Sequence, residues 1–226
     1  MKKIFIFGNN YLSEILWYYL QQEGNSVEGF VLNNEYVSLN TYSLPAALYS
    51  IEDVITKYGG KNICVYLTIG NTQMNAVREK VYNGLKKIGV EIRTYIHPSA
   101  CIAKNVQIEE GSIILENVIL QPYVRLGKCN IVWQGVNISH HCMIGNYNYF
   151  APSVTVAGCC KIENKCFFGV NSTLVDHVNV GDSCFLAAGV CVTHNMKEDT
   201  AISFNGHSCV NKSGTEKCRL YEQRSK

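Results

Sequence analysis

The stretch that decides the fold reads VNISHHCMIGNYNYFAPSVTVA and covers residues 136–157. A large apolar residue returns in it at every sixth position, as Ile138, Ile144, Phe150 and Val156. Repetition at a fixed period is the sequence signature of a stacked, quasi-one-dimensional architecture, and a period of six is typical of a parallel β-helix.

The period continues on both sides of this stretch without a change of register. Every sixth residue from 102 to 192 is apolar: Ile102, Ile108, Ile114, Leu120, Leu126, Val132, Ile138, Ile144, Phe150, Val156, Ile162, Phe168, Leu174, Val180, Leu186 and Val192. The positions two residues earlier all hold small or compact side chains. We expect six residues to form one flat side of a triangular coil, with the large side chains inside and the small ones at its corners. The sequence therefore predicts a β-helix domain over residues 97–195.

The eleven cysteines do not form a disulfide or zinc framework by their pattern, because their number is odd and no Cys-x-x-Cys pair occurs. Four of them, Cys142, Cys160, Cys166 and Cys184, fall on the small inward position of the repeat. We expect these four to be ordinary core residues.

Residues 1–96 show a different pattern, in which short apolar strands alternate with amphipathic helices. Strands are predicted over Lys3–Phe7, Val27–Leu32, residues 62–68 and Val90–Ile96, and helices over residues 12–20, 51–58 and 74–85. This alternation predicts a small α/β domain with a parallel, Rossmann-like sheet. The polar tail, residues 196–226, is expected to cap the far end of the β-helix.

Parallel sheets bind ligands where their strands end, so we take the residues that follow the strands as candidates for substrate binding. They are Gly8, Asn9, Asn10, Tyr11, Asn33, Asn34, Gly70 and Asn71. The first turn keeps a single glycine and lacks the rest of G-x-G-x-x-G, which argues against a tightly held dinucleotide. A tight turn of purely structural importance is an equally good interpretation of Gly8.

Composition excludes several classes of function. The 226 residues are 47% hydrophobic and 17% charged, as expected of a globular protein, and the net charge of +2 gives no basic footprint for nucleic acid. The apolar run near the start ends at Gly8, too early for a signal peptide, and no window is long enough to span a bilayer. We expect a cytoplasmic protein that is not inserted in a membrane.

The repeat, with its frequent glycine after the large apolar residue, resembles the left-handed β-helix acyltransferases. Together with the α/β domain in front, it resembles the sugar acetyltransferases of the sialic-acid O-acetyltransferase and bacillosamine N-acetyltransferase group. The resemblance implies a left-handed helix, acetyl-CoA as co-substrate and no metal. It also implies a homotrimer, a nucleotide-sugar substrate held by the α/β domain, and a place in the synthesis of cell-surface glycans.

The resemblance also assigns site residues. Members carry a catalytic histidine followed by an acidic residue, and the matching stretch is Ser139-His140-His141-Cys142-Met143-Ile144-Gly145. His140 falls on the position of the general base, and His141 replaces the acid. Tyr149 stands where some members have a second histidine near the thioester. Residues expected at the acetyl-CoA groove are Tyr149, Gly158, Gly169, Val170, Ala187 and Ala188.

The implied chemistry suits these residue types. A sugar amine must lose a proton to attack a thioester at neutral pH, and histidine is the usual base for this step. The backbone N–H of Gly158 is a candidate donor to the oxyanion. We therefore expect N-acetylation of a UDP- or dTDP-linked amino-deoxy sugar.

Two alternatives remain open at the level of sequence, and a third is disfavoured by the spacing of the histidines. The same residues suit O-acetylation of a sialic-acid-like hydroxyl. The β-helix could also be a scaffold without enzymatic activity. A zinc carbonic anhydrase on this helix needs three clustered histidines, but His140, His177 and His194 are separated by 37 and 17 residues.

Overall fold

The computed structural model describes residues 2–205, 208–209 and 212–213, with side chains as far as residue 203. The chain divides into two compact units, Met1–Gly70 with Lys80–Arg93 and Asn71–Glu79 with Thr94–Lys226. The segment Asn71–Glu79, which the sequence pattern places with the N-terminal domain, thus belongs to the second unit. Among the described residues, no helix is both long and apolar enough to cross a membrane.

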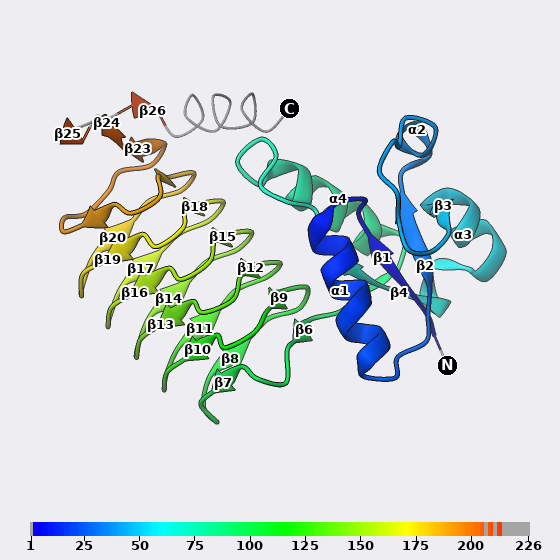
Figure 1. Cartoon of the computed structure of the whole chain (residues 1–226), viewed down its shortest axis with the longest axis horizontal. Coiled ribbons are helices and arrows are strands. Elements are labelled where there is room, and N and C mark those ends of the chain that lie inside the picture. The colour runs from blue at the N-terminus through cyan, green and yellow to red at the C-terminus, as the bar shows by residue number, and fades with distance from the viewer. Residues whose placement is uncertain (1, 206–207, 210–211, 214–226) are drawn as a thin grey trace. The chain divides into compact units, whose positions relative to one another are not determined.

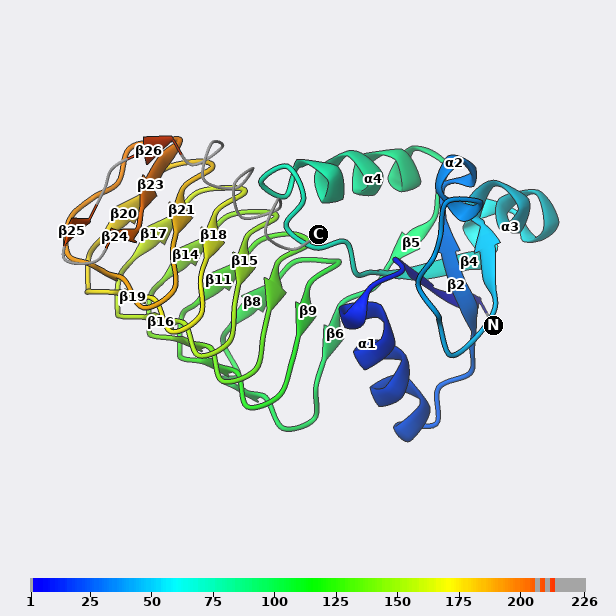
Figure 2. The ribbon, with the colours of Figure 1, turned by 45° about the horizontal axis from the view of Figure 1, so that its top comes forward.

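The first unit is an α/β fold in which helices and strands alternate (Figure 2). Its five-stranded sheet has the order β3-β2-β1-β4-β5, and every neighbouring pair is parallel. Its elements are β1 (Lys3–Phe7), α1 (Tyr11–Gln22), β2 (Val27–Leu32), α2 (Asn34–Val37), β3 (Leu48–Ser50), α3 (Ile51–Tyr58), η1 (Gly60–Asn62), β4 (Ile63–Leu67), the C-terminal part of α4 (Ala76–Lys87) and β5 (Glu91–Ile92). The predicted parallel sheet is confirmed. Its strand order changes direction at β1, so the turns after β1 and β4 end side by side at one edge.

Two predicted elements were wrong in their extent. Helix α4 begins at Ala76 rather than at Met74, because Gln73, Met74 and Asn75 have φ of 50°, 49° and 65°, which no right-handed helix can contain. The predicted strand Val90–Ile96 is two strands: β5 joins the sheet, and β6 (Tyr95–Ile96) pairs with the β-helix. The single turn α2 and the short strand β3 were not predicted, because the polar stretch that holds them shows no clear period.

The second unit is a left-handed parallel β-helix, as predicted, with three flat faces (Figure 1). Face I contains β7 (Cys101–Ile102), β10 (Ile119–Leu120), β13 (Asn137–Ile138), β16 (Thr155–Val156), β19 (Thr173–Leu174) and β22 (Cys191–Val192). Face II contains β8 (Gln107–Ile108), β11 (Arg125–Leu126), β14 (Met143–Ile144), β17 (Lys161–Ile162) and β20 (Asn179–Val180). Face III contains β6, β9 (Ile113–Ile114), β12 (Ile131–Val132), β15 (Tyr149–Phe150), β18 (Phe167–Phe168), β21 (Phe185–Leu186), β23 (Thr200–Ile202) and β26 (Lys212–Ser213).

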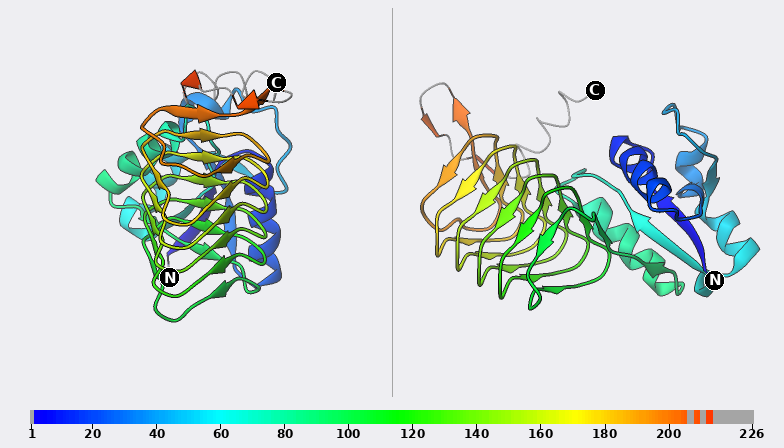
Figure 3. Two further views of the ribbon diagram at one scale, coloured as in Figure 1. Left: turned by 90° about the vertical axis from the view of Figure 1, so that its left-hand side faces the viewer. Right: turned by 60° about the horizontal axis from the view of Figure 1, so that its bottom comes forward.

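Residues 18 apart therefore lie above one another on successive coils, as Figure 3 shows for the stacked coils. The second residue of each strand from β7 to β22 is one of the sixteen apolar positions of the repeat. Fourteen of these are buried, while Ile102 and Ile108 on the first coil are partly buried. The stacked rings of Phe150 and Phe168, 4.6 Å apart, fill part of the interior. The predicted β-helix is therefore confirmed in the register of its strands and in the burial of its apolar residues.

The cysteines behave as core residues. Cys142, Cys160, Cys166 and Cys184 are all buried inside the prism, and the nine cysteines whose side chains the structure describes are all free thiols. Two buried asparagines, Asn130 and Asn148, also occupy the small inward position of the repeat. Asn148 shows how the polar groups of such a side chain are satisfied. Its side chain accepts from the N–H of Cys166 at 2.8 Å and donates to the carbonyl of Glu163 at 2.9 Å. At the corners, the amide side chain of Asn148 thus forms hydrogen bonds with buried backbone groups that need a partner.

The chain end continues the helix in part. Strand β23 pairs with β21 in parallel, β26 pairs with β23 antiparallel, and β24 (Phe204–Asn205) forms a two-stranded sheet with β25 (Ser208–Cys209). The expected cap at residues 196–226 stays a prediction, since residues 206–207, 210–211 and 214–226 lie outside the described part of the chain.

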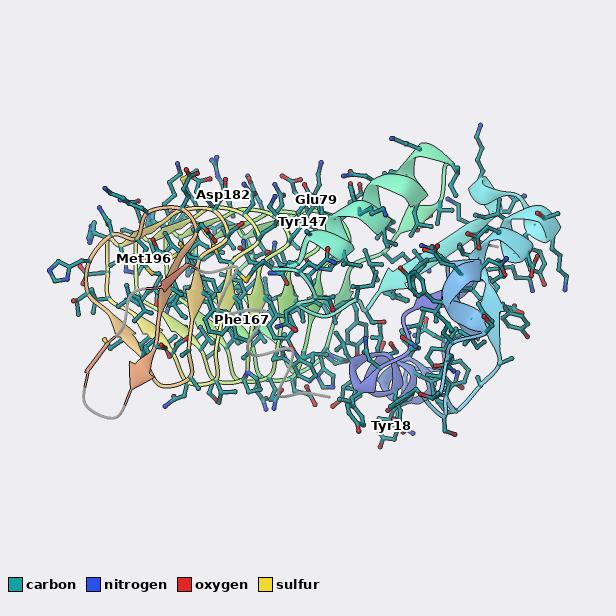
Figure 4. The ribbon with its side chains drawn as sticks, turned by 90° about the horizontal axis from the view of Figure 1, so that it is seen from above. Tyr18, Glu79, Tyr147, Phe167, Asp182 and Met196 are labelled. Atoms are coloured by element: carbon teal, nitrogen blue, oxygen red, sulfur yellow. The ribbon has the colours of Figure 1, made fainter. Side chains whose placement is uncertain are left out.

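Arg78, on the first turns of α4, is fully buried and fastens its segment to the β-helix. Its guanidinium donates to the carbonyls of Cys129 at 2.9 Å and Tyr147 at 2.7 Å, and to Asn75 Oδ1 at 3.0 Å. Desolvation lowers the pKa of Arg78 to about 10, so the group stays charged at neutral pH. The neighbouring Glu79 forms an ion pair with Lys165, with 3.3 Å between Oε2 and Nζ. Figure 4 labels Glu79 and Tyr147.

We expect Arg78→Met to lower the free energy of unfolding by roughly 3 kcal/mol, because it leaves several buried carbonyls without a donor. Arg78→Lys should recover little of this loss, since an ammonium group cannot reproduce the fork of the guanidinium. Urea denaturation measures the effect, and Lys80→Ala, an exposed change on the same helix, is the control expected to cost nothing measurable. Equal stabilities of Arg78→Met and Lys80→Ala would refute the anchoring role.

Candidate active site

The site predicted at His140 lies at the corner where face I turns into face II. His140 and His141 are the two turn residues between β13 and β14. The second residue of this turn has a left-handed backbone on successive coils, with φ of 68° at Tyr123, 61° at His141 and 59° at Cys159. The corner therefore repeats every 18 residues and presents a fixed column of side chains.

The two imidazoles contact each other directly. His140 Nδ1 lies 3.1 Å from His141 Nδ1, with the rings edge to face at 5.3 Å between centroids. His141 also stacks on the ring of Tyr123 at 4.6 Å. His141, the residue that follows the predicted base, thus contacts Nδ1 of that base and leaves its Nε2 outside this contact.

The His140 ring lies against Gly158, one coil further along the column. A Cβ built on Gly158 would lie 2.6 Å from His140 Cε1 and 2.8 Å from Nε2, so no larger residue fits beneath the ring. The Gly158 carbonyl accepts from the N–H of His177 at 3.0 Å. Its own N–H donates no hydrogen bond within the part of the chain that the structure describes. A free donor therefore lies beside the candidate base.

The backbone around the pair is held firmly. The His140 N–H donates to Gln121 Oε1 at 3.1 Å, and the His141 N–H donates to the carbonyl of Pro122 at 3.1 Å. Beside His141, a cavity of about 360 Å³ opens over face II. Its lining consists of Asn105, Gln107, Tyr123, Arg125, His141 and Met143. Arg125 is the one cation in this lining and makes the cavity suitable for an anionic group.

The residues predicted for acetyl-CoA fall on two corners of one chain. Gly158 lies beside His140 at the corner between faces I and II. Gly169 and Val170 lie at the corner between faces III and I, and Ala187 and Ala188 lie at the same corner on the next coil. Gly169 is needed for close stacking there, because a Cβ would lie 2.5 Å from the nitrogen of Ala188. Tyr149 lies on face III, stacked on Phe167 at 5.3 Å; Figure 4 labels Phe167. Within one chain, only Gly158 of the predicted acetyl-CoA residues is brought together with His140.

The turn after β1 has a strong structural role. Gly8 is buried, and a Cβ there would lie 2.3 Å from Thr68 Oγ1 and 2.6 Å from Ser13 Oγ. Asn10 caps α1 by accepting from the Ser13 N–H at 3.1 Å, and it donates to the carbonyl of Thr68 at 2.9 Å. Both groups of its amide are therefore used within the fold.

The other candidates of this edge are more open. Asn9 Nδ2 donates to Asn40 Oδ1 at 3.0 Å, and Tyr11 is 74% exposed, with its ring edge-on to Tyr42 at 5.3 Å. Asn33 and Asn34 follow β2 and begin α2. Gly70 ends the first segment of this unit, whereas Asn71 begins the segment that belongs to the second unit.

Sequence reasoning missed three residues of the histidine corner: Gln121, Tyr123 and Cys159. A signal for two of them was present, because Tyr123 and Cys159 lie 18 residues before and after His141 and must therefore stack with it. The hydrogen bond from the His140 backbone to Gln121 had no such signal.

The comparisons agree with this architecture. Residues 160–194 match the family model described as the hexapeptide repeat of succinyl-transferase. A comparison with curated proteins gives no match. Several solved structures match over nearly the whole chain, and they establish the fold: a hexapeptide-repeat β-helix with an α/β unit in front of it.

Three of these structures illustrate the likeness. A variant of GDP-perosamine N-acetyl transferase from Caulobacter crescentus, with one histidine replaced by alanine and in complex with CoA and GDP-perosamine, is 18% identical, with a TM-score of 0.81 and coverage of 94% of this chain and 98% of that one. The acetyltransferase domain of PglB from Neisseria gonorrhoeae is 15% identical, with a TM-score of 0.78 and coverage of 93% and 100%. WeeI from Acinetobacter baumannii is 20% identical, with a TM-score of 0.68 and coverage of 93% and 100%. The predicted resemblance to sugar acetyltransferases is confirmed at the level of fold.

Proposed function

We propose that this protein is an acetyltransferase that moves the acetyl group of acetyl-CoA to the amino group of a nucleotide-linked amino-deoxy sugar, with UDP or dTDP as the nucleotide. The observation that carries the proposal is the histidine corner, where a paired imidazole lies over a glycine whose N–H is unused. Similar folds support it, since the Caulobacter transferase was solved with CoA and GDP-perosamine and the Neisseria domain with acetyl coenzyme A.

The Nδ1–Nδ1 contact supports a different role for each histidine. If His140 Nδ1–H donates to His141 Nδ1, then His140 Nε2 keeps its lone pair and acts as the general base. His141 is then the positioning residue, in the place that an acidic side chain takes in the resembling family. His140 Nε2 accepts a proton from the neutral sugar amine as its nitrogen attacks the thioester carbonyl. When the tetrahedral intermediate collapses, the C–S bond breaks and the protonated imidazole returns the proton to the sulfur, so that CoA leaves as the thiol.

The Gly158 N–H is the proposed oxyanion donor. It has no hydrogen-bond partner in the described chain and lies next to the base, so it could stabilise the tetrahedral intermediate without first breaking a bond. A glycine here also lets the base lie flat against the coil.

The assembly is proposed to be a cyclic homotrimer. Val170 and Ala188 lie at a different corner from His140, so a CoA molecule that contacts both sets needs a second copy of the chain. Both co-substrates are intracellular metabolites, and we accordingly propose a cytoplasmic protein that serves the synthesis of cell-surface glycans. Light scattering tests the assembly, and a fully active monomer would contradict it.

The nucleotide is proposed to bind at the edge of the first unit, where β1, β2 and β4 end. Tyr11 offers an exposed ring for the base, with Asn9, Asn33, Asn34 and Gly70 as polar or backbone contacts. Stacking of a base on an aromatic side chain is worth about 1–3 kcal/mol.

We expect Tyr11→Ala to raise the KM of the nucleotide sugar about tenfold, in line with the loss of one stacking contact. The KM of acetyl-CoA and kcat should change little. Tyr18→Ala is the matched control, because Tyr18 is another exposed tyrosine of α1, 59% exposed and labelled in Figure 4. If both variants behave alike, Tyr11 has no part in nucleotide binding.

A direct screen tests the proposed function. Acetyl-CoA should raise the melting temperature, because a ligand selective for the folded state stabilises it. UDP-, dTDP- and GDP-linked amino sugars are then offered with acetyl-CoA, and release of free CoA thiol is followed. A hydroxyl acceptor of the sialic-acid type serves as the competing substrate. Thiol release with the hydroxyl acceptor alone would show that the enzyme is an O-acetyltransferase. A melting temperature that acetyl-CoA does not change would favour a β-helix scaffold without enzymatic activity.

A further inference from the structure

A third potential ligand lies beside the two histidines of the corner. The ligand atoms of His140, His141 and Cys159 all lie within 4.8 Å of one another. We propose that these three side chains bind a thiophilic transition-metal ion of the Zn²⁺ class, and that its binding inhibits the enzyme. The inhibitory part rests on the proposed function, whereas the binding part does not.

The spacing of the imidazoles fits such an ion closely. Two nitrogens at Zn–N distances of about 2.0–2.1 Å in a tetrahedral site lie roughly 3.3–3.4 Å apart. The Nδ1 atoms of His140 and His141 already lie 3.1 Å apart. Two of the three ligands are therefore close to their bound separation before any ion arrives.

The three ligands stand on a rigid frame. The Cys159 N–H donates to the carbonyl of His140 at 2.9 Å, so the cysteine and the histidine are tied across adjacent coils. His141 and Cys159 occupy the same corner position, one coil apart, with φ of 61° and 59°. Preorganised ligands on regular structure lose little entropy when they bind a metal.

The site is also open to solvent. His140 and His141 are exposed and Cys159 is half-buried, which leaves room for a fourth ligand such as water. Histidine nitrogen and cysteine sulfur favour Zn²⁺, Co²⁺ and related ions over Mg²⁺ or Ca²⁺. This is a different arrangement from the all-histidine site of a carbonic anhydrase, because the third ligand beside the two histidines is the sulfur of Cys159.

Binding of one metal ion releases one proton. The Cys159 thiol loses its proton and becomes the thiolate ligand. On neutral His140, the proton on Nδ1 moves to Nε2, so that Nδ1 binds the ion. His141 binds through Nδ1, which already carries a lone pair. His140 Nε2 then holds a hydrogen and can no longer accept one from the sugar amine, which is why the ion inhibits.

Co²⁺ added to the metal-free, full-length protein tests the binding without reference to activity. We expect a near-ultraviolet thiolate-to-cobalt charge-transfer band at one equivalent, displaced by Zn²⁺. Cys159→Ser should abolish the band. Cys191→Ser, which removes an exposed cysteine on face I, is the matched control and should keep it. A band that persists in Cys159→Ser, or that never forms in the wild type, would overturn the site.

Inhibition is tested separately on acetyl transfer. Zn²⁺ should inhibit the wild type, and a chelator should restore the rate. Cys159→Ser should keep the basal rate but need at least about 100-fold more Zn²⁺ for half-inhibition, since loss of a ligand costs at least as much as loss of an outer-shell partner. Metal binding without inhibition would show that the site exists but that His140 is not the base, which separates failure of the proposed mechanism from failure of the site.

Discussion

His140→Ala should lower the kcat of acetyl transfer by about 10²–10⁴-fold, the range that a positioned general base contributes. The ring is exposed and packs over a glycine at a corner, so its removal opens no cavity in the prism. Affinity for acetyl-CoA and the melting temperature should therefore stay near those of the wild type. Steady-state kinetics and thermal melting measure both quantities on the same preparations.

Variants of His141 separate the base from its positioning residue. His141→Ala should cost less than His140→Ala, about 10- to 100-fold, as for other partners that orient a functional imidazole. His141→Asp should recover most of this loss, because a carboxylate accepts the His140 Nδ1–H at least as well as an imidazole does. If His140→Ala stays near wild type while His141→Ala collapses, the roles are exchanged.

Gly158→Ala should lower kcat by about 10²-fold, through displacement of the base rather than loss of a functional group. The new Cβ would lie 2.6 Å from His140 Cε1, so the ring has to move by a distance that commonly costs this much in rate. The backbone N–H is kept in this variant, so the proposed oxyanion donor is still present.

A double-mutant cycle distinguishes displacement of the His140 ring from an independent effect of Gly158. If the alanine acts only by pushing the imidazole, then adding Gly158→Ala to His140→Ala should change the rate little further. Full additivity of the two losses would mean that Gly158 acts independently of His140, for example by shaping the CoA site. Gly84→Ala is the control for glycine replacement itself, since its Cβ would meet nothing within 4 Å.

The β-helix could be predicted almost completely because one simple rule governs it. Each large residue such as Ile138 or Phe150 must fill the same interior, and each coil repeats the last, so one register error would have exposed a whole row of side chains. The buried thiols of Cys142 and Cys166 followed from the same rule. The regular strands β1 and β2 were predicted with their observed bounds, because an apolar run between turn residues is a local signal.

What the sequence could not show depends on contacts far apart in the chain. Arg78 appeared as an ordinary residue of an amphipathic helix, and only the carbonyls of Cys129 and Tyr147 make its burial favourable. The left-handed turn at residues 73–75 contains no glycine and so carried no turn signal. The division of the strand at residues 90–96 likewise follows from pairing partners that are distant in sequence.

The candidate site was predictable in its residues and not in its geometry. His140, His141 and Gly158 followed from the resemblance to known acetyltransferases. Their mutual contacts depend on which rotamers the corner allows, and no pattern in the sequence fixes those. For the nucleotide edge, Gly8 and Asn10 proved to have structural roles in the fold, so binding there is better tested at Tyr11.

The proposed acetyl transfer is tested most directly by the chemical structure of the product formed from acetyl-CoA and a nucleotide-linked amino sugar. Mass spectrometry and NMR should show one acetyl group on the sugar nitrogen, formed in a one-to-one ratio with free CoA by the wild type and about 10²–10⁴-fold more slowly by His140→Ala. Failure to acetylate any UDP-, dTDP- or GDP-linked amino sugar, or equal rates for the wild type and His140→Ala, would contradict the account.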